Sequence, residues 1–206
     1  MAIKDVYDAV VTFDLGRIAE TVQAELESGA EVKTILNDGL IAPLDEVGRR
    51  FSQGELFMPE MLRAANTMKK GLEVLRPRLE NADDLSRGTV VLGTVKGDLH
   101  DIGKNLVGMM LEGGGFKVVD LGVDVGAEHF IAAVEQSGAR VVGLSALLTT
   151  TMPAMKAIIA AIREKGLVVK TMVGGAPVTR SFAEEIGADG YGHDAPSAVK
   201  LVRSFL

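Results

Sequence analysis

The chain has no cysteine, no tryptophan and only 4% aromatic residues. Without cysteine, it cannot contain a disulfide framework, a thiolate zinc site, an iron–sulfur cluster or a cysteine nucleophile. Basic residues are also scarce: 22 Lys and Arg face 28 Asp and Glu, which gives a net charge of -6. Phosphate recognition needs a basic surface, and no run of residues approaches the roughly 18 apolar residues of a membrane span. We therefore expect a cytoplasmic protein with neither a nucleic-acid nor a membrane partner.

The distribution of glycine divides the 206 residues into two parts: six of the 24 glycines lie in residues 1–85 and eighteen in residues 86–206. In the first part, apolar residues such as Ile18, Val22 and Leu26 recur at helical spacing. In the second, short β-branched runs alternate with helical stretches, as in repeated βα units. We predict a helical domain over 1–85 and an α/β domain over 86–206; that the helical domain is a cap is implied only by the family resemblance given below.

The pattern predicts the individual elements as well. Four helices are expected near 2–13, 15–28, 31–52 and 58–79, followed by a short linker at 81–84. Strands are expected at 89–95, 117–121, 140–147, 168–173 and near 190–191, with helices near 102–114, 127–137, 151–165, 179–187 and 195–205. The predicted fold class is α/β: a flavodoxin- or Rossmann-like five-stranded parallel sheet with helices on both faces, preceded by a four-helix bundle.

The loop after the first strand contains Asp98-Leu99-His100-Asp101-Ile102-Gly103. Ligands of open α/β sheets bind beyond the carboxyl ends of the strands. In an extended segment, residues i and i+2 project to the same side, so Asp98 can accept the N–H of one His100 ring nitrogen while the other faces outward. This is how a carboxylate supports a metal-ligating histidine. The tripeptide alone equally suits turn and cap residues beside an ordinary loop histidine.

Other chemistries fit this loop poorly. A P-loop needs four residues between its glycines and then Lys-Ser or Lys-Thr, whereas five residues separate Gly97 from Gly103, and Asn105 follows Lys104. A phosphorelay receiver needs an acidic pocket, for which the second and third strand ends offer only Asp120 and Asp124. A hydrolase with a divalent metal at this loop would have an incomplete set of ligands.

Two further strand ends carry small residues. Ser145 and Leu147 end the third strand, and Gly174-Gly175 follow the fourth. A glycine pair leaves a slot without side chains, as close approach of a bulky ligand requires. Ser145 has no assignable partners for a nucleophilic hydrolase, so the pattern favours a long, narrow binding cleft.

Together these motifs resemble the cobalamin-binding corrinoid proteins of methyltransferase systems. The family pattern D-x-H-x-x-G, S-x-L and G-G is met here with gaps of 41 and 26 residues. The helical part is similar to the family's cap in the phrase from Phe51 to Glu60, with Met58 where Leu is usual. The resemblance covers nearly the whole chain.

The resemblance implies roles for individual residues. His100 would be the lower axial ligand of cobalt, Asp98 would hold its other nitrogen, and Ser145 would complete that chain of hydrogen bonds or contact the nucleotide tail. Gly174, Gly175 and Leu147 would line the tail tunnel, and Phe51 and Met58 would cover the upper cobalt face. Further cofactor contacts are implied at Thr94, Gly97, Asp101, Ile102, Gly103, Thr149, Tyr191 and Gly192.

The same resemblance implies a methyl carrier that uses cobalamin or a related corrinoid, whose cobalt cycles between a methylated and a reduced Co(I) state. It would accept a methyl group from a substrate:corrinoid methyltransferase and pass it to a second methyltransferase, toward tetrahydrofolate or coenzyme M, with a reductive activase as a third partner. About 120 residues of α/β domain leave no room for a substrate-binding TIM barrel of about 250 residues, so a subunit is expected rather than a complete enzyme. The alternatives are a cobalamin-sensing regulatory module and the cobalamin subunit of a mutase.

Overall fold

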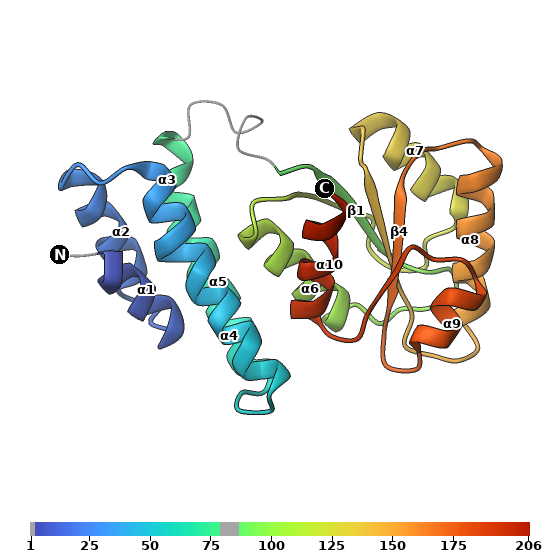
Figure 1. Cartoon of the computed structure of the whole chain (residues 1–206), viewed down its shortest axis with the longest axis horizontal. Helices are drawn as coiled ribbons and strands as arrows, with labels where there is room; N and C mark the ends of the chain where they lie inside the picture. Colours follow the sequence, from blue (N-terminus) through green and yellow to red (C-terminus); the bar gives the residue numbers. More distant parts are fainter. Residues whose placement is uncertain (1–2, 79–86) are drawn as a thin grey trace. The chain divides into compact units, whose positions relative to one another are not determined.

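The computed structural model describes residues 3–78 and 87–206. The chain forms two compact units (Figure 1): one is the described part of Met1–Ser86 together with Glu112–Gly115, and the other is Arg87–Leu111 with Phe116–Leu206. The predicted linker at 81–84 and the predicted boundary after residue 85 lie outside the described residues.

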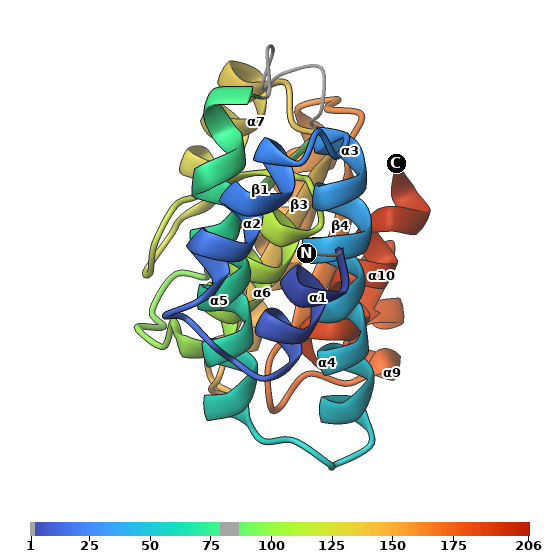
Figure 2. The ribbon, with the colours of Figure 1, turned by 90° about the vertical axis from the view of Figure 1, so that its left-hand side faces the viewer.

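The first unit is a bundle of helices (Figure 2). Its elements are α1 (Ile3–Val11), α2 (Ile18–Glu27), α3 (Val32–Thr34), the π-helical η1 (Ile35–Ile41), α4 (Ala42–Ser52), α5 (Met58–Leu75) and the 3-10 turn η2 (Arg76–Arg78). Because α3, η1 and α4 follow one another without a break, they form the single helix predicted over 31–52. The four-helix arrangement is therefore present, with a π-helical stretch that the sequence did not predict.

Close packing of α5 explains a glycine in the middle of this helix. A Cβ on Gly71 would lie 2.7 Å from the side chain of Leu40 and 3.0 Å from that of Ile18. Both neighbours are fully buried, so glycine lets α5 approach η1 and α2. The core of this unit is built from the apolar faces that the periodicity identified.

The second unit is a parallel sheet in the order β2-β1-β3-β4-β5. Its elements are β1 (Thr89–Thr94), α6 (Ile102–Gly113), β2 (Lys117–Asp120), α7 (Ala127–Ser137), β3 (Val141–Ser145), α8 (Met152–Glu164), β4 (Lys170–Gly174), α9 (Arg180–Glu185), β5 (Gly190–Gly192) and α10 (Ala195–Phe205). This is the flavodoxin-like strand order, so the predicted fold class is confirmed.

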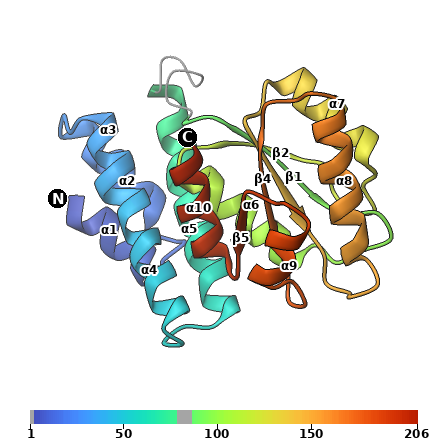
Figure 3. The same cartoon turned by 45° about the vertical axis from the view of Figure 1, so that its right-hand side comes forward.

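Helices cover both faces of the sheet. Helices α6 and α10 lie on one face and α7 and α8 on the other (Figures 1 and 3). The core on the α7 and α8 side includes Val91, Phe130, Val142 and Ile158, all buried. A Cβ on Gly93 would lie 2.5 Å from the ring of Phe130, so glycine in β1 makes room for this ring.

None of the helices in the described residues is both long enough and apolar enough to cross a membrane.

Candidate functional site

One row across the sheet brings predicted site residues together at its carboxyl edge. The parallel register aligns, from β1 through β3 and β4 to β5, Thr94, Ser145, Gly174 and Gly192. Each of these residues is the last of its strand. The loops that leave this row are therefore neighbours, at the edge where open α/β sheets bind ligands.

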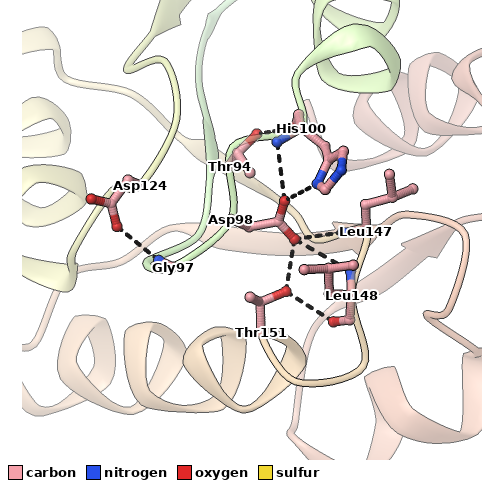
Figure 4. A network of polar contacts seen from close by, with 8 residues as sticks. All are labelled: Thr94, Gly97, Asp98, His100, Asp124, Leu147, Leu148 and Thr151. Atoms are coloured by element: carbon pink, nitrogen blue, oxygen red, sulfur yellow. Dashed lines mark hydrogen bonds and ion pairs between the residues drawn. The ribbon is translucent and has the colours of Figure 1, made fainter.

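His100 and Asp98 form a side-chain pair in the loop after β1 (Figure 4). Nδ1 of His100 lies 2.7 Å from Oδ1 of Asp98, which confirms the pairing expected from their spacing. The backbone N–H of His100 donates to the same oxygen at 3.1 Å. The geometry is an Asx turn, in which a carboxylate accepts from the N–H two residues on, and not the extended strand that the sequence argument assumed.

Asp98 is a buried carboxylate with several donors. Its side chain is 0% exposed, and Oδ2 accepts from the hydroxyl of Thr151 at 2.7 Å and from the backbone N–H groups of Leu147 at 2.8 Å and Leu148 at 3.3 Å (Figure 4). Burial acts to raise the pKa of Asp98, but the hydrogen bonds from Thr151, Leu147 and His100 outweigh burial and hold this pKa well below its usual value. Asp98 is therefore charged at neutral pH.

The charge on Asp98 decides which nitrogen of His100 carries the proton. An ionised carboxylate only accepts hydrogen bonds, so the hydrogen between the two side chains is on Nδ1. In the neutral imidazole the lone pair is then on Nε2, on a side chain that is 50% exposed. A carboxylate on the far nitrogen orients an imidazole and strengthens it as a metal ligand.

Exposed apolar side chains lie in the segments around this imidazole. Of the nine large hydrophobic residues that are exposed in the described parts of the chain, five follow β1, β2 or β3 at the carboxyl edge: Leu99, Val123, Leu147, Leu148 and Ile102. Among these five, Leu99, at 71%, and Ile102, at 64%, are the most exposed. Gathered apolar exposure of this kind marks a binding surface.

These features together suit a corrinoid. Within residues 3–78 and 87–206, no three His, Asp or Glu side chains come together as a metal-binding group. A single outward-facing imidazole is sufficient for a metal that brings its own in-plane ligands, as cobalt does in a corrin ring. The apolar segments beside His100 are suited to the broad face of such a ring.

The glycines of the site serve two different purposes. A Cβ on Gly175 would lie 1.9 Å from the carbonyl oxygen of Ala146, and a Cβ on Gly174 would lie 2.8 Å from that of Gly192. These glycines therefore let neighbouring strand ends approach each other, and the space of their missing side chains is filled by backbone; it is not the open slot predicted from the sequence. At Gly103, by contrast, a Cβ would meet nothing within 4 Å, so the chain's own packing does not require glycine there.

The hydroxyl that completes the chain of hydrogen bonds is that of Thr151, which sequence reasoning missed. Ser145, to which either this role or a contact with the nucleotide tail was assigned, ends β3 half-buried, and none of the hydrogen bonds found among the described residues involves its side chain. Its contact with the nucleotide tail stays a prediction. The sequence signal for Thr151 was weak: it is the last of three consecutive threonines before α8, and such residues commonly cap helices.

The other predicted contacts have diverse surroundings. Thr94 is fully buried and its hydroxyl donates to the carbonyl oxygen of His100 at 2.9 Å, so it supports the loop from within. The carboxylate of Asp101 accepts from the side chain of Asn105 at 3.0 Å, beside the start of α6. Thr149 is exposed in the loop after β3, and Tyr191 is half-buried in β5. Their contacts with a cofactor stay predictions.

Phe51 and Met58 belong to the helical unit. Phe51 lies half-buried near the end of α4, and Met58, which is 41% exposed, is the first residue of α5. The side chain of Glu60 caps α5 by accepting the backbone N–H of Phe57 at 2.7 Å. The predicted contact of Phe51 and Met58 with the cofactor also stays a prediction.

Two family models match the sequence, both described as B12 binding domains, one over residues 88–200 and the other over residues 2–76. The chain belongs to the B12-binding corrinoid proteins. This corrinoid protein is 43% identical to trimethylamine corrinoid protein 1 of Methanosarcina acetivorans, across 97% of its own length and 94% of the relative's. The family predicted from the sequence motifs is confirmed.

Two solved structures resemble this corrinoid protein over nearly its whole length. A cobalamin-binding protein from Desulfitobacterium hafniense matches with a TM-score of 0.85 and 30% identity, covering 100% of this chain and 98% of that chain. The methanol:cobalamin methyltransferase complex of Methanosarcina barkeri matches with a TM-score of 0.85 and 32% identity, covering 98% of this chain and 78% of that chain. The protein is thus a corrinoid protein of the methyltransferase-associated kind, with cobalamin or a related corrinoid as its cofactor.

Proposed function

We propose that the protein carries a methyl group on the cobalt of a bound corrinoid, with Nε2 of His100 as the lower axial ligand. The observation that supports this proposal is the 2.7 Å contact between Nδ1 of His100 and the buried carboxylate of Asp98, which leaves Nε2 as the ring nitrogen not engaged by Asp98, on a side chain that is 50% exposed. When bound, the corrinoid supplies a cobalt atom that accepts and releases the methyl group.

The chain's own residues control how firmly the imidazole is presented. Asp98 holds the Nδ1 proton, and the donors from Thr151 and Leu147 keep Asp98 ionised. Because the carboxylate cannot turn away without losing these bonds, the ring of His100 is held in one tautomer and one orientation. Leu99 and Ile102, both exposed, would contact the apolar face of the corrin ring next to His100 and exclude water from that contact.

We further propose that methyl groups arrive through a substrate:corrinoid methyltransferase and leave through a second methyltransferase. A reductive activase would return oxidised, inactive cobalt to its reduced state. The relatives support this proposal, since one is a trimethylamine corrinoid protein and another solved structure is a methanol:cobalamin methyltransferase complex. A methylated amine is the first donor to test. A cytoplasmic location fits this cycle, because the cytosol is kept reducing.

The axial ligand can be tested on the ¹⁵N-labelled protein loaded with unlabelled cobalamin and reduced to Co(II). A ¹⁵N ligand from the protein splits each cobalt line of the electron paramagnetic resonance spectrum into a doublet, whereas the ¹⁴N base of the cofactor gives a triplet. We expect doublets in the parent protein and their loss in His100→Ala. His129→Ala is the matched control, because His129 is also an exposed histidine beside a carboxylate, 3.2 Å from Glu128.

The outcomes separate the proposal from its rivals. Doublets that persist in His100→Ala, or triplets in the parent protein, would show that His100 is not the ligand. Carriage of the methyl group is tested separately, by incubating the loaded protein with a methylamine and its methyltransferase. A cobalt centre that takes up no methyl group from methylated amines, methanol, betaine or aromatic methyl ethers would contradict the carrier function.

A further inference from the structure

The loop between β2 and α7 holds the His100 loop from the neighbouring strand (Figure 4). The carboxylate of Asp124 accepts the backbone N–H of Gly97 at 2.7 Å. The backbone N–H of Asp124 in turn donates to the carbonyl oxygen of Asp98 at 2.9 Å. Asp124 therefore binds the Gly97–Asp98 dipeptide at both of its ends.

The backbone at this contact is unusual on both sides. Asp124 has φ 56°, in the left-handed region that residues other than glycine rarely adopt, although Asp and Asn tolerate it best. Gly97 has φ 84°. A bridge between Val95 and Val125 closes the contact on its other side. Such a conformation persists only when the surrounding bonds determine it, and here those bonds lead directly to Asp98.

The contact with Gly97 also stabilises the charged form of Asp124. The N–H of Gly97 is the main cause that lowers the pKa of Asp124; slight burial opposes this effect, and the ammonium of Lys96, 3.6 Å away, adds to it. Asp124 itself touches neither the ring of His100 nor the carboxylate of Asp98. Its effect on the imidazole must therefore pass through the backbone of the loop.

A second anchor lies on the other side of His100. The ammonium of Lys104, in the first turn of α6, donates to Oδ1 of Asp120 at the end of β2, at 2.6 Å. The side chain of Lys104 is only 3% exposed. The β2 side of the sheet thus holds the His100 loop before the histidine through Asp124 and after it through Asp120.

We propose that Asp124 is a positioning residue for the axial imidazole: it fixes the Gly97–Asp98 turn from which the carboxylate reaches His100. This inference rests on the proposed role of His100 as the cobalt ligand. Loss of the Asp124 carboxylate frees the turn, so the imidazole is presented less often in the orientation that binds cobalt, while the fold and the corrinoid pocket remain.

The test compares three variants in the ¹⁵N doublet experiment described above. Asp124→Gly keeps a residue suited to the left-handed backbone while it removes the side chain with its carboxylate, so we expect it to fold and to bind cobalamin. In Asp124→Gly the ratio of histidine-ligated to unligated cobalt should fall about two- to tenfold. This is the change in an equilibrium constant that the loss of one hydrogen bond typically causes. Asp124→Asn keeps an acceptor for Gly97 and should restore the ratio. Lys96→Ala removes the ion pair alone and should match the parent.

Each result has a defined meaning. An unchanged doublet ratio in Asp124→Gly would overturn the inference, and so would an equal loss in Lys96→Ala or a failure of Asp124→Asn to restore the ratio. A parent protein without doublets would instead overturn the proposed role of His100, so the two failures are distinguishable. The melting temperature of each variant and its cobalamin stoichiometry show that the ratio reports ligation and not unfolding.

Discussion

At the scale of single residues, the site is organised around one buried charge. Asp98 is fully buried, yet it has five donors: the hydroxyl of Thr151, the backbone N–H groups of Leu147 and Leu148, and both the backbone N–H and Nδ1 of His100. A buried charge is tolerated only when its hydrogen-bonding capacity is satisfied. Removing any one donor therefore affects both the stability of the loop and the orientation of the imidazole.

The pH dependence of folding provides a test of this charge. The pKa of Asp98 is lower in the folded than in the unfolded protein, where it is about 3.9. Its contribution to stability is therefore fully present above the unfolded value and is lost as the pH falls toward the folded value. Below about pH 4, the free energy of unfolding of the parent should fall more steeply than that of Asp98→Asn, by up to about 1.4 kcal/mol per pH unit.

Urea denaturation at intervals from pH 6 to the acid limit measures this difference. The other acidic residues with lowered pKa, Glu46, Asp124 and Asp189, are present in both proteins, so the comparison isolates Asp98. Parallel curves for parent and variant would show that Asp98 is not held ionised by its neighbours.

Replacing glycine by alanine should have opposite effects on stability at two positions of the site, Gly175 and Gly103. Gly175→Ala places a Cβ against the carbonyl oxygen of Ala146 at a left-handed backbone position, so we expect destabilisation by about 1–3 kcal/mol. Gly103→Ala meets no atom of the chain and replaces a glycine in α6, so it should leave the protein as stable or stabilise it by up to about 1 kcal/mol. Cobalamin affinity should nevertheless fall in Gly103→Ala if the ring approaches this turn.

Thermal unfolding of the cofactor-free proteins and cobalamin titration separate these effects. A stable Gly103→Ala protein with unchanged cobalamin affinity would show that the cofactor does not approach Gly103. A Gly175→Ala protein as stable as the parent would contradict the tight approach of β4 to the loop after β3.

At the scale of elements, helix starts are fixed by specific side chains. Asp194 caps α10: its carboxylate accepts the N–H of Ser197 at 2.7 Å, and the hydroxyl of Ser197 accepts the N–H of Asp194 at 3.1 Å. Helix α10 covers one face of the sheet and buries Val199 and Val202. The cap is therefore coupled to the core of the α/β unit.

Asp194→Ala should lower the free energy of unfolding by about 1 kcal/mol, because an orphan N–H at the helix start loses its acceptor. Asp194→Asn, which keeps an acceptor, should lose much less. Urea denaturation measures both values. Equal losses in the two variants would indicate that the charge, and not the cap, stabilises this end of α10.

The elements themselves were largely predictable from the sequence. Strand positions followed from β-branched runs, and Pro59 near the start of α5 marked a helix boundary. The π-helical stretch Ile35–Ile41 was not predicted, because its residues have ordinary helical periodicity. The contact of Thr151 with Asp98 joins residues 53 positions apart, and no local pattern specifies such a pair. The Asp98–His100 pair was predictable because both residues lie in one short turn.

At the scale of the whole molecule, the chain has two units with separate cores. A corrinoid that contacts the α/β unit should stabilise the folded state by mass action, by about 2.7 kcal/mol when free cobalamin exceeds its dissociation constant a hundredfold. Differential scanning calorimetry should show the transition of the α/β unit move to higher temperature as cobalamin is added. In His100→Ala the shift at the same concentration should be smaller, and equal shifts would mean that the axial bond adds nothing to affinity.

The hydrogen bonds to Asp98 have a consequence for the life of the protein before it meets its cofactor. All of these donors are supplied by the chain itself, so folding alone sets the charge and tautomer of the site. Newly made protein could then be stored in a finished, loadable form, and supply of the corrinoid would limit the amount of active carrier without limiting the amount of folded carrier. A cell could increase its capacity for methyl transfer as soon as the cofactor arrives, without waiting for new protein synthesis.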